Sequence, residues 1–373
     1  MHVPALTDLP KIVDLFAGPG GLDMAAHALM IPAVGIEWDD DACKTRHRAG
    51  LSTEHDDVRK FGPGSFPSAD ILAGGPPCQT FTVAGSGAGR RALDQVIGFA
   101  RRMAAGEDIR AELSELDDER TGLVLEPLRW AIEAIALGRP YQTIVLEQVP
   151  AVLPVWAEYR RILEDKGYVA NHGVLHTEEF GVPQTRRRAI LIARLRDPKA
   201  SAPVVVELPK PTHQRFHKHN GAPQIAFDSG LATWVTMGDV LNRRAPFEVV
   251  SNYGTGGDPK NRGRRTHAEP AFTVTGKISR NRVIDSRIAN PSANDYTRFD
   301  NSEAGLLQTF PAGYPWAGNA VAQQIGNAIP PRLGVHVLAA ALGLGTEDIA
   351  AALKRLENWE APAQPGPVES DVR

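Results

Sequence analysis

The first half of the chain repeats one pattern, a short apolar run that ends in a glycine or an acid and precedes residues at helical spacing. Lys11–Gly18 is the first such run, Ala33–Glu37 is the second, and Tyr141–Pro150 is a longer one. Near-continuous apolar strands are typical of a parallel sheet that is buried on both faces. The pattern therefore predicts an α/β fold in which helices cover both faces of the sheet.

This pattern stops at Asp197. From there to Thr297 proline, glycine and polar residues dominate, and we expect short strands at Phe247–Ser251 and Ala271–Thr275 and a helix at Met237–Arg243. A chain of 373 residues suits one large domain and a smaller one, because single cores stop growing near ~250 to 300 residues. We predict a first domain over residues 1–196 with a helical insertion at about 93–119, a smaller irregular domain over 197–297, a return to the first domain over 298–345, and a C-terminal helix with a disordered tail over 346–373.

The formal net charge of -3 hides an uneven distribution. From Lys210 to Arg298 there are 14 Lys and Arg against 7 Asp and Glu, which leaves 27 against 37 for the rest of the chain. A positive field confined to one region indicates a segment that faces a polyanion. The alternative is an ordinary solvated surface.

Only two cysteines are present, Cys43 and Cys78. They cannot form a disulfide framework or fill a structural zinc site, and the charged, proline-bearing N-terminus does not resemble a signal peptide. No apolar run approaches the ~18 to 20 residues that span a bilayer. We expect a monomer in a reducing cytoplasm, with no metal and no membrane contact.

Cys78 lies in an unusual turn. The apolar run Ala69–Leu72 ends in Ala73-Gly74-Gly75-Pro76-Pro77-Cys78, where glycines allow close backbone approach and prolines stiffen the loop. Such a loop holds a sulfur in one place at the end of a strand, so we interpret Cys78 as a nucleophile. The alternative is a buried small hydrophobic residue, which is our interpretation of Cys43.

Three successive strand ends offer groups that suit an adenosine. The turn Gly18-Pro19-Gly20-Gly21 lets a ligand approach the backbone at a helix N-terminus. Glu37 can accept hydrogen bonds from a ribose, Trp38 offers a face to an adenine ring, and the acid of Asp57-Val58 can meet the adenine amino group. A dinucleotide fold for hydride transfer is the competing interpretation.

Charged residues near other strand ends complete the candidate site. Glu147 ends the Tyr141–Pro150 strand, where ligands bind in open α/β sheets, although a solvated acid or helix cap would also fit there. Arg186 and Arg188 alternate along an extended segment and therefore point to one side, toward the site or a nucleic-acid phosphate. The glycine-rich basic loop that ends at Arg91 and the run Lys260–Arg265 suit phosphate or base contacts.

Together these motifs resemble the DNA cytosine-5 methyltransferases of bacterial or phage modification type, over about Lys11 to Leu342. Gln148 stands where the family has an asparagine that supports the catalytic loop, and the insertion at about 93–119 lengthens the connection after the closing loop. Neither departure removes a catalytic group. The matching motifs are Phe16-Ala17-Gly18-Pro19-Gly20-Gly21, Glu37-Trp38, Asp57-Val58, Pro77-Cys78-Gln79, Glu147-Gln148-Val149, Gln184-Thr185-Arg186-Arg187-Arg188, Leu307-Gln308-Thr309-Phe310-Pro311 and Gly326-Asn327-Ala328-Ile329-Pro330.

The resemblance implies a Rossmann-like methyltransferase sheet, a target-recognition domain over 197–297, and methyl transfer from S-adenosylmethionine to carbon 5 of a cytosine flipped out of a specific duplex DNA sequence. Cys78 would form a covalent adduct at carbon 6, Glu147 would stabilise the ring, and Arg186 and Arg188 would favour the thiolate. The implied cofactor contacts are Phe16, Gly18, Gly20, Gly21, Glu37, Trp38, Asp57, Val58, Pro76, Leu123, Asn327 and Ala328. We expect DNA contacts at Ser86, Arg90, Arg91, Gln184, Arg262, Arg264 and Arg265.

Other functions stay open at this point. A transfer-RNA cytosine methyltransferase shares these motifs, although the sizeable basic region favours a DNA reader. A catalytically silent DNA-binding relative would not need Cys78, Glu147 and the arginines together, and a nicotinamide-dependent oxidoreductase leaves Pro77-Cys78-Gln79 unexplained. The sequence does not give the target DNA sequence, a partner restriction endonuclease, a host or phage origin, or the role of the insertion.

Overall fold

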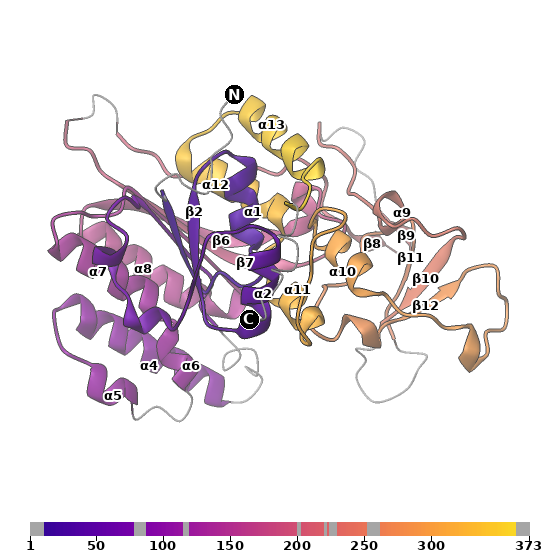
Figure 1. Ribbon diagram of the computed structural model, residues 1–373, viewed down its shortest axis with the longest axis horizontal. Coiled ribbons are helices and arrows are strands. Elements are labelled where there is room, and N and C mark those ends of the chain that lie inside the picture. Colours follow the sequence, from indigo (N-terminus) through magenta and orange to yellow (C-terminus); the bar gives the residue numbers. More distant parts are fainter. Residues whose placement is uncertain are drawn as a thin grey trace, which may run out of the picture.

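The computed structural model describes residues 11–77, 87–114, 119–199, 203–219, 222–223, 230–251 and 262–362. A seven-stranded sheet of order β3-β2-β1-β4-β5-β7-β6 forms the larger part of the molecule (Figure 1). Its strands are β1 (Ile12–Leu15), β2 (Ala33–Glu37), β3 (Thr53–His55), β4 (Ile71–Gly74), β5 (Thr143–Gln148), β6 (Tyr168–His176) and β7 (Arg187–Leu195). Strands β1 to β5 are parallel, and β7 runs antiparallel between β5 and β6. The expected α/β fold with a Rossmann-like sheet is confirmed.

Helices cover both faces of this sheet. They are α1 (Gly21–Ala28), α2 (Asp40–Arg48), α4 (Gly87–Ala104), α5 (Arg110–Ser114), α6 (Glu119–Leu123), α7 (Glu126–Ala136), α8 (Leu153–Asp165), α12 (Pro331–Leu342) and α13 (Thr346–Glu357). Side chains alternate along a strand, so neighbours face opposite sides. Val13 and Leu15 join a hydrophobic cluster with α4, α7 and α8, whereas Ile12 joins one with α1, α12 and α13. The end of the chain thus returns to the larger part.

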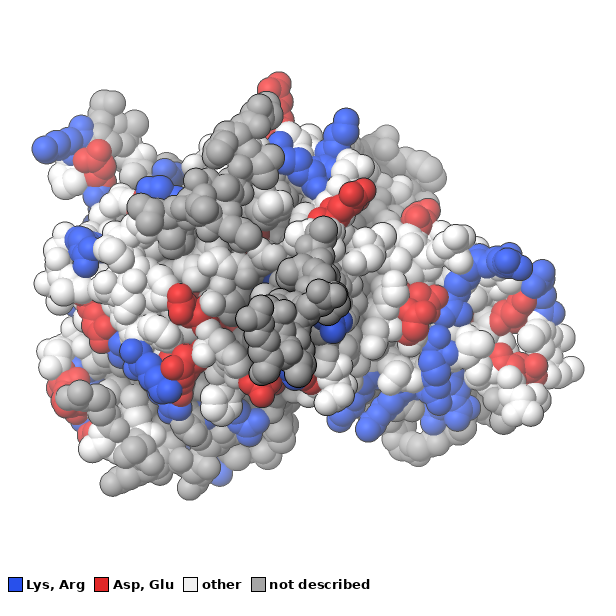
Figure 2. Space-filling model, viewed as in Figure 1, with Lys and Arg blue, Asp and Glu red and all other residues white. Residues whose placement is uncertain are grey.

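The smaller part comprises the described residues between 203 and 297 and lies at one end of the molecule (Figure 1). Strand β10 (Phe247–Val250) lies between β11 (Arg264–Thr266) and β12 (Arg282–Asp285), and β8 (Lys218–His219) pairs with β9 (Ala222–Pro223). One hydrophobic cluster joins β10 and α9 (Met237–Val240) to α10 (Asn301–Leu307) and α11 (Val321–Asn327). Figure 2 shows many Lys and Arg side chains over this part, with fewer Asp and Glu among them, and both signs of charge over the larger part.

Three expected elements differ from the structure. The helix expected at Met237–Arg243 ends at Val240. Ala271–Thr275 is not a strand, because only Ala271 makes an isolated bridge, to Gln184. Side chains bind its backbone instead: the Val274 N–H donates to Gln184, and the Val274 carbonyl accepts from Arg186. The expected insertion at about 93–119 starts inside a helix, because α4 runs from Gly87 to Ala104. The division into four domains stays a prediction.

Cys43 is buried, and its thiol lies 3.4 Å from the Glu37 carbonyl oxygen. Burial raises the pKa of this thiol to about 12, in keeping with a structural residue. Within the described ranges, none of the helices is both long and apolar enough to cross a membrane. The same ranges bring no three His, Cys, Asp or Glu side chains together as ligands for a metal ion.

Candidate active site

A cavity of about 490 Å³ lies at the carboxyl ends of β1, β2, β4 and β5. Ligands bind at this edge in open α/β sheets. The segment between α11 and α12 closes one side, so residues from both ends of the chain meet there. The predicted site residues that line the cavity are Phe16, Gly18, Gly21, Glu37, Trp38, Asp57, Val58, Leu123, Glu147, Arg188, Asn327 and Ala328.

The glycine turn after β1 brings the start of α1 against its neighbours. Gly18 and Gly20 have φ angles of 55° and 100°, in the left-handed region that favours glycine. A Cβ on Gly20 would lie 2.2 Å from Leu51, and one on Gly21 would lie 2.2 Å from the Ile329 carbonyl oxygen. A Cβ on Gly18 would meet nothing within 4 Å. Gly20 and Gly21 therefore fix the turn, while Gly18 leaves space beside the cavity.

Glu37 organises the rim of the cavity. Its carboxylate accepts hydrogen bonds from the backbone N–H groups of Gly18 at 2.7 Å, Trp38 at 2.9 Å and Asp39 at 2.8 Å. The glycine turn and the end of β2 are thereby held together. The Trp38 side chain is 73% exposed, an unusual position for so large an apolar group, and it leaves a ring face free for a ligand.

The remaining predicted cofactor residues take different positions. Asp57 accepts a hydrogen bond from the Arg59 N–H at 2.9 Å, and bonding to the Arg59 guanidinium lowers the pKa of the Asp57 carboxyl. Leu123 reaches the cavity from α6. Pro76 is buried and is not among the described residues that line the cavity, whereas its neighbour Pro77 lines it.

Glu147 and Arg188 form an ion pair inside the cavity. Glu147 Oε1 lies 2.5 Å from Arg188 Nε, and the two side chains are 14% and 11% exposed. They meet because β5 and β7 are antiparallel neighbours, which brings the end of one beside the start of the other. A Cβ on Gly75 would lie 3.4 Å from Glu147 Oε2, so the acid stands beside the loop that leads to Cys78.

Cys78 itself lies outside the described residues, and its role stays a prediction. The loop before it is tied to the sheet by Gln148, whose side-chain amide donates to the Pro76 carbonyl and accepts from the Val149 N–H. The longer side chain at position 148 thus binds the backbone two residues before Cys78. Gln148, the residue that departs from the family motif, therefore supports the start of this loop.

Arg186 and Gln184 are placed differently from our expectation. Arg186 is fully buried and is not among the described residues that line this cavity; its guanidinium donates to the carbonyls of Val274, Gly326 and Ala328 at 2.8 to 3.1 Å. Burial lowers the pKa of Arg186. Gln184 is also buried, and its amide oxygen accepts from the Val274 N–H at 2.9 Å, so it cannot reach DNA in this conformation. Both residues join the larger part to the smaller part.

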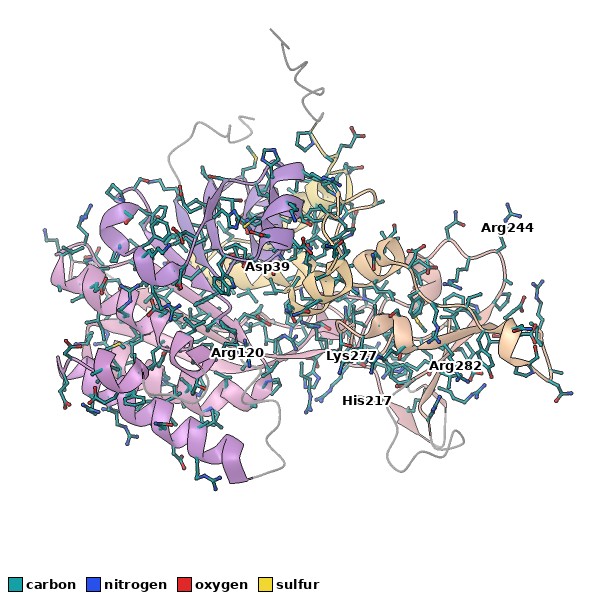
Figure 3. The ribbon with its side chains drawn as sticks, turned by 60° about the horizontal axis from the view of Figure 1, so that its bottom comes forward. Asp39, Arg120, His217, Arg244, Lys277 and Arg282 are labelled. Atoms are coloured by element: carbon teal, nitrogen blue, oxygen red, sulfur yellow. The ribbon has the colours of Figure 1, made fainter. Side chains whose placement is uncertain are left out.

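Three predicted DNA contacts belong to the expected loop after Cys78, but from Gly87 onward the structure has helix α4 in its place. Ser86 and the side chain of Arg90 lie outside the described residues. Arg91 is exposed on α4, where a phosphate can reach its guanidinium. Figure 3 shows four labelled side chains, Arg120, Lys277, His217 and Arg282, following one another across the view from the larger part to the smaller part.

The described arginines of the predicted basic run in the smaller part are either exposed or half-buried. Arg262 is half-buried, and Arg264 is exposed but pairs with Glu248 at 2.5 Å. Arg265 lies between the rings of Phe216 and Phe272, 4.9 and 4.4 Å from their centroids, and donates to two backbone carbonyls. Burial lowers the pKa of Arg265 to about 10. Arg265 is therefore built into the smaller part rather than presented for a base edge.

Sequence reasoning missed three groups in or behind the cavity. Asp14 lies within β1 and lines the cavity, and burial, reinforced by Asp23, raises the pKa of its carboxyl. Behind it Arg46 and Asp23 form a fully buried bidentate pair at 2.7 and 2.9 Å. The sequence signal that could have revealed Asp14 is its position as an acid inside the otherwise apolar run Ile12–Leu15. Arg120, exposed in α6, also lines the cavity, so the expected insertion leads directly to it.

Comparisons with known proteins agree with this geometry. Residues 10–96 and 142–342 match the family model of the C-5 cytosine-specific DNA methylases. The type II methyltransferase M.NgoFVII of Neisseria gonorrhoeae is 26% identical over 374 residues, which cover 88% of this chain and 85% of the relative. The type II methyltransferase M1.HphI of Haemophilus parahaemolyticus is 25% identical over 381 residues, which cover 90% of this chain and 87% of the relative.

Solved structures share the fold. The Entamoeba histolytica methyltransferase EhMeth superposes with a TM-score of 0.59 at 13% identity, over 90% of this chain and 99% of the other. The S. pombe Dnmt2 methyltransferase gives a TM-score of 0.56 at 16% identity, over 89% of this chain and 98% of the other. At such identities the likeness bears on the fold alone.

Proposed function

The chain belongs to the family of C-5 cytosine-specific DNA methylases and is a DNA (cytosine-5-)-methyltransferase, and on this premise we propose its reaction in detail. It transfers a methyl group from S-adenosylmethionine to carbon 5 of a cytosine flipped out of a specific duplex DNA sequence, through a covalent Cys78 adduct. The observation that carries the proposal is the Glu147–Arg188 ion pair, with 2.5 Å between Oε1 and Nε, in one cavity with the glycine turn.

The cavity suits S-adenosylmethionine, which membership of the family implies. Glu37 would accept hydrogen bonds from the ribose hydroxyls, Trp38 would stack on the adenine, and Asp57 would meet the adenine amino group. The open space beside Gly18 and the exposed Trp38 ring support this fit, because both leave surface for a ligand. When bound, S-adenosylmethionine supplies an electrophilic methyl group on a sulfonium.

Cytosine carbon 5 is a weak nucleophile, so the ring must first be activated. The Cys78 thiolate adds to carbon 6, and Glu147 holds a proton at ring nitrogen 3 to neutralise the charge that the addition puts on the ring. After carbon 5 has taken the methyl group, a base that we take to be water removes the carbon-5 proton. The bond between Cys78 and carbon 6 then breaks, which restores the thiolate and the aromatic ring. Arg188 orients the Glu147 carboxylate throughout.

Duplex DNA is the substrate that the charge distribution favours. The segment from Lys210 to Arg298 carries an excess of seven positive charges, 14 against 7. The target base has to leave the stack, at a cost of a few kcal/mol, because an enzyme cannot reach its ring inside the duplex. We expect the segment between Cys78 and the start of α4 at Gly87 to close behind it. We also infer a monomer in a reducing cytoplasm, where Cys78 stays a thiol, and any cognate restriction endonuclease would act separately.

The test is incubation of the purified protein with radiolabelled S-adenosylmethionine and, separately, mixed-sequence duplex DNA and total transfer RNA. Nucleoside analysis should find the label as 5-methylcytosine in DNA. Label in RNA alone would reassign the basic region to RNA recognition. Absence of label from both, with measurable cofactor binding, would contradict the proposed reaction and favour a silent relative.

A further inference from the structure

A second cavity, of about 360 Å³, lies at the same edge of the large sheet. Strand β7 connects the two places, because it pairs with β5 on one side and with β6 on the other. The larger part contributes the end of β6, the helical turn η4 (Thr177–Phe180) and the start of β7. In Figure 3 the labelled His217, which lines this cavity, lies between Arg120 and Arg282. The smaller part contributes Arg215, Phe216, His217, Arg265 and Thr273.

Glu178 is the acid that lines this second cavity among the described residues. It is only 2% exposed, and its Oε2 atom is buried with no hydrogen-bond partner in that part of the chain. Its Oε1 lies 3.8 Å from His176 Nδ1, but burial lowers the pKa of His176 to about 4, so that ring carries no charge at neutral pH. A buried oxygen without a partner costs about 1–3 kcal/mol, so a partner that arrives with a ligand would explain it.

Cations surround this acid. Arg187 and Arg215 are exposed, Arg265 is half-buried between two rings, and the buried Arg186 also lines the cavity. A phosphate suits the exposed arginines but cannot pair with Glu178, since both are anions. The unpartnered oxygen of Glu178 needs an N–H donor. Burial raises the pKa of the Glu178 carboxyl to about 7, and a hydrogen bond from an N–H group would lower that pKa again, because it favours the ionised carboxylate. A nucleotide offers both groups, and the volume falls within the roughly 300–1,000 Å³ of ligand sites.

We propose that this cavity receives the major-groove edge of one base of the bound DNA, and that Glu178 accepts a hydrogen bond from the exocyclic amino group on that edge. Cytosine N4 and adenine N6 are such donors, whereas guanine O6 and thymine O4 only accept. Arg187 and Arg215 hold the neighbouring phosphates. Glu178 is then a specificity-determining residue for one position of the target sequence. The inference rests on the proposed function in that its ligand is the DNA substrate.

The test is a selection from a pool of duplexes with a randomised centre, in which the DNA retained by the full-length protein is sequenced. Wild-type protein should favour C or A over G or T at one position, by about 5- to 150-fold for a contact of 1–3 kcal/mol. Glu178→Gln should lose this preference, because a glutamine amide both donates and accepts. Glu178→Leu should lose it too and should fold, since it replaces an unpartnered buried acid with an apolar side chain of similar size.

The matched control is Glu179→Gln, which removes a neighbouring carboxylate that acts on Arg215 but does not line the cavity. This variant should keep the wild-type preference. Wild-type preference in both Glu178 variants, or equal loss in Glu179→Gln, would overturn the inference. If the wild type selects a sequence but transfers no methyl group, the proposed reaction is wrong. The sequence preferences of the wild type and the Glu178 variants then still test the role of Glu178. If the wild type selects no sequence, both fail.

Discussion

Exchange of Glu147 for glutamine separates a chemical role for this acid from a structural one. Glu147→Gln keeps the shape of the side chain but removes the charge that faces Arg188 at 2.5 Å. In the proposed reaction, the ring then loses the group that neutralises it while Cys78 adds to carbon 6. We expect the single-turnover rate constant for methyl transfer to fall by about 10²- to 10⁴-fold, the usual contribution of a positioned general acid.

The same change breaks an ion pair, and its cost in stability can be bounded. At 2.5 Å and an effective dielectric constant of about 20, the Coulomb attraction is roughly 7 kcal/mol before any desolvation is subtracted. The two side chains have already lost most of their hydration, at 14% and 11% exposure, which offsets much of that attraction. Because the glutamine keeps a polar oxygen beside Arg188 and leaves only the charge attraction unreplaced, we expect the free energy of unfolding to fall by about 1–3 kcal/mol.

The Arg243–Glu303 pair provides the matched control. Its atoms lie 2.6 Å apart, its side chains are 21% and 18% exposed, and Glu303 is in α10, away from the cavity. Glu303→Gln should lose a similar free energy of unfolding in urea and keep the rate constant measured by rapid quench at saturating DNA. An unchanged rate constant in Glu147→Gln, or an equal fall in both variants, would refute the chemical role of Glu147.

Three further changes test other parts of the site. Cys78→Ala should abolish methyl transfer while calorimetry still detects S-adenosylmethionine binding; retained transfer would exclude Cys78 as the nucleophile. Trp38→Ala should weaken S-adenosylmethionine binding by about 1 kcal/mol, roughly fivefold in Kd, and unchanged affinity would mean that the ring does not stack. Arg46→Met leaves Asp23 and Asp14 buried without a cation, so the free energy of unfolding in urea should fall by about 3–5 kcal/mol; no change would contradict the buried network.

The sequence predicted the parts of this molecule that depend on local pattern. The apolar runs predicted the strands of the large sheet. Because the carboxyl ends of parallel strands meet at one edge, Glu37 and Glu147 could be assigned to one site from the sequence, and both line the same cavity. Contacts between distant segments could not be predicted in this way. The alternation of side chains along an extended segment predicts the side to which Arg186 points. It does not predict that Arg186 is buried, because its burial depends on hydrogen bonds to the distant carbonyls of Val274 and Gly326. Likewise Ala271–Thr275 has the composition of a strand, yet side chains rather than strands bind it.

The segment from Gln184 to Arg188 connects the two cavities. Arg188 meets Glu147 in the first, whereas Thr185, Arg186 and Arg187 line the second. Arg186 is also anchored to carbonyls of both the smaller part and the segment before α12. A base at Glu178 and a cytosine at Glu147 would therefore be held at a separation that one anchored segment sets. A duplex that cannot donate to Glu178 would present its cytosine out of register with Glu147. Sequence preference should then appear in the rate of methyl transfer as well as in binding.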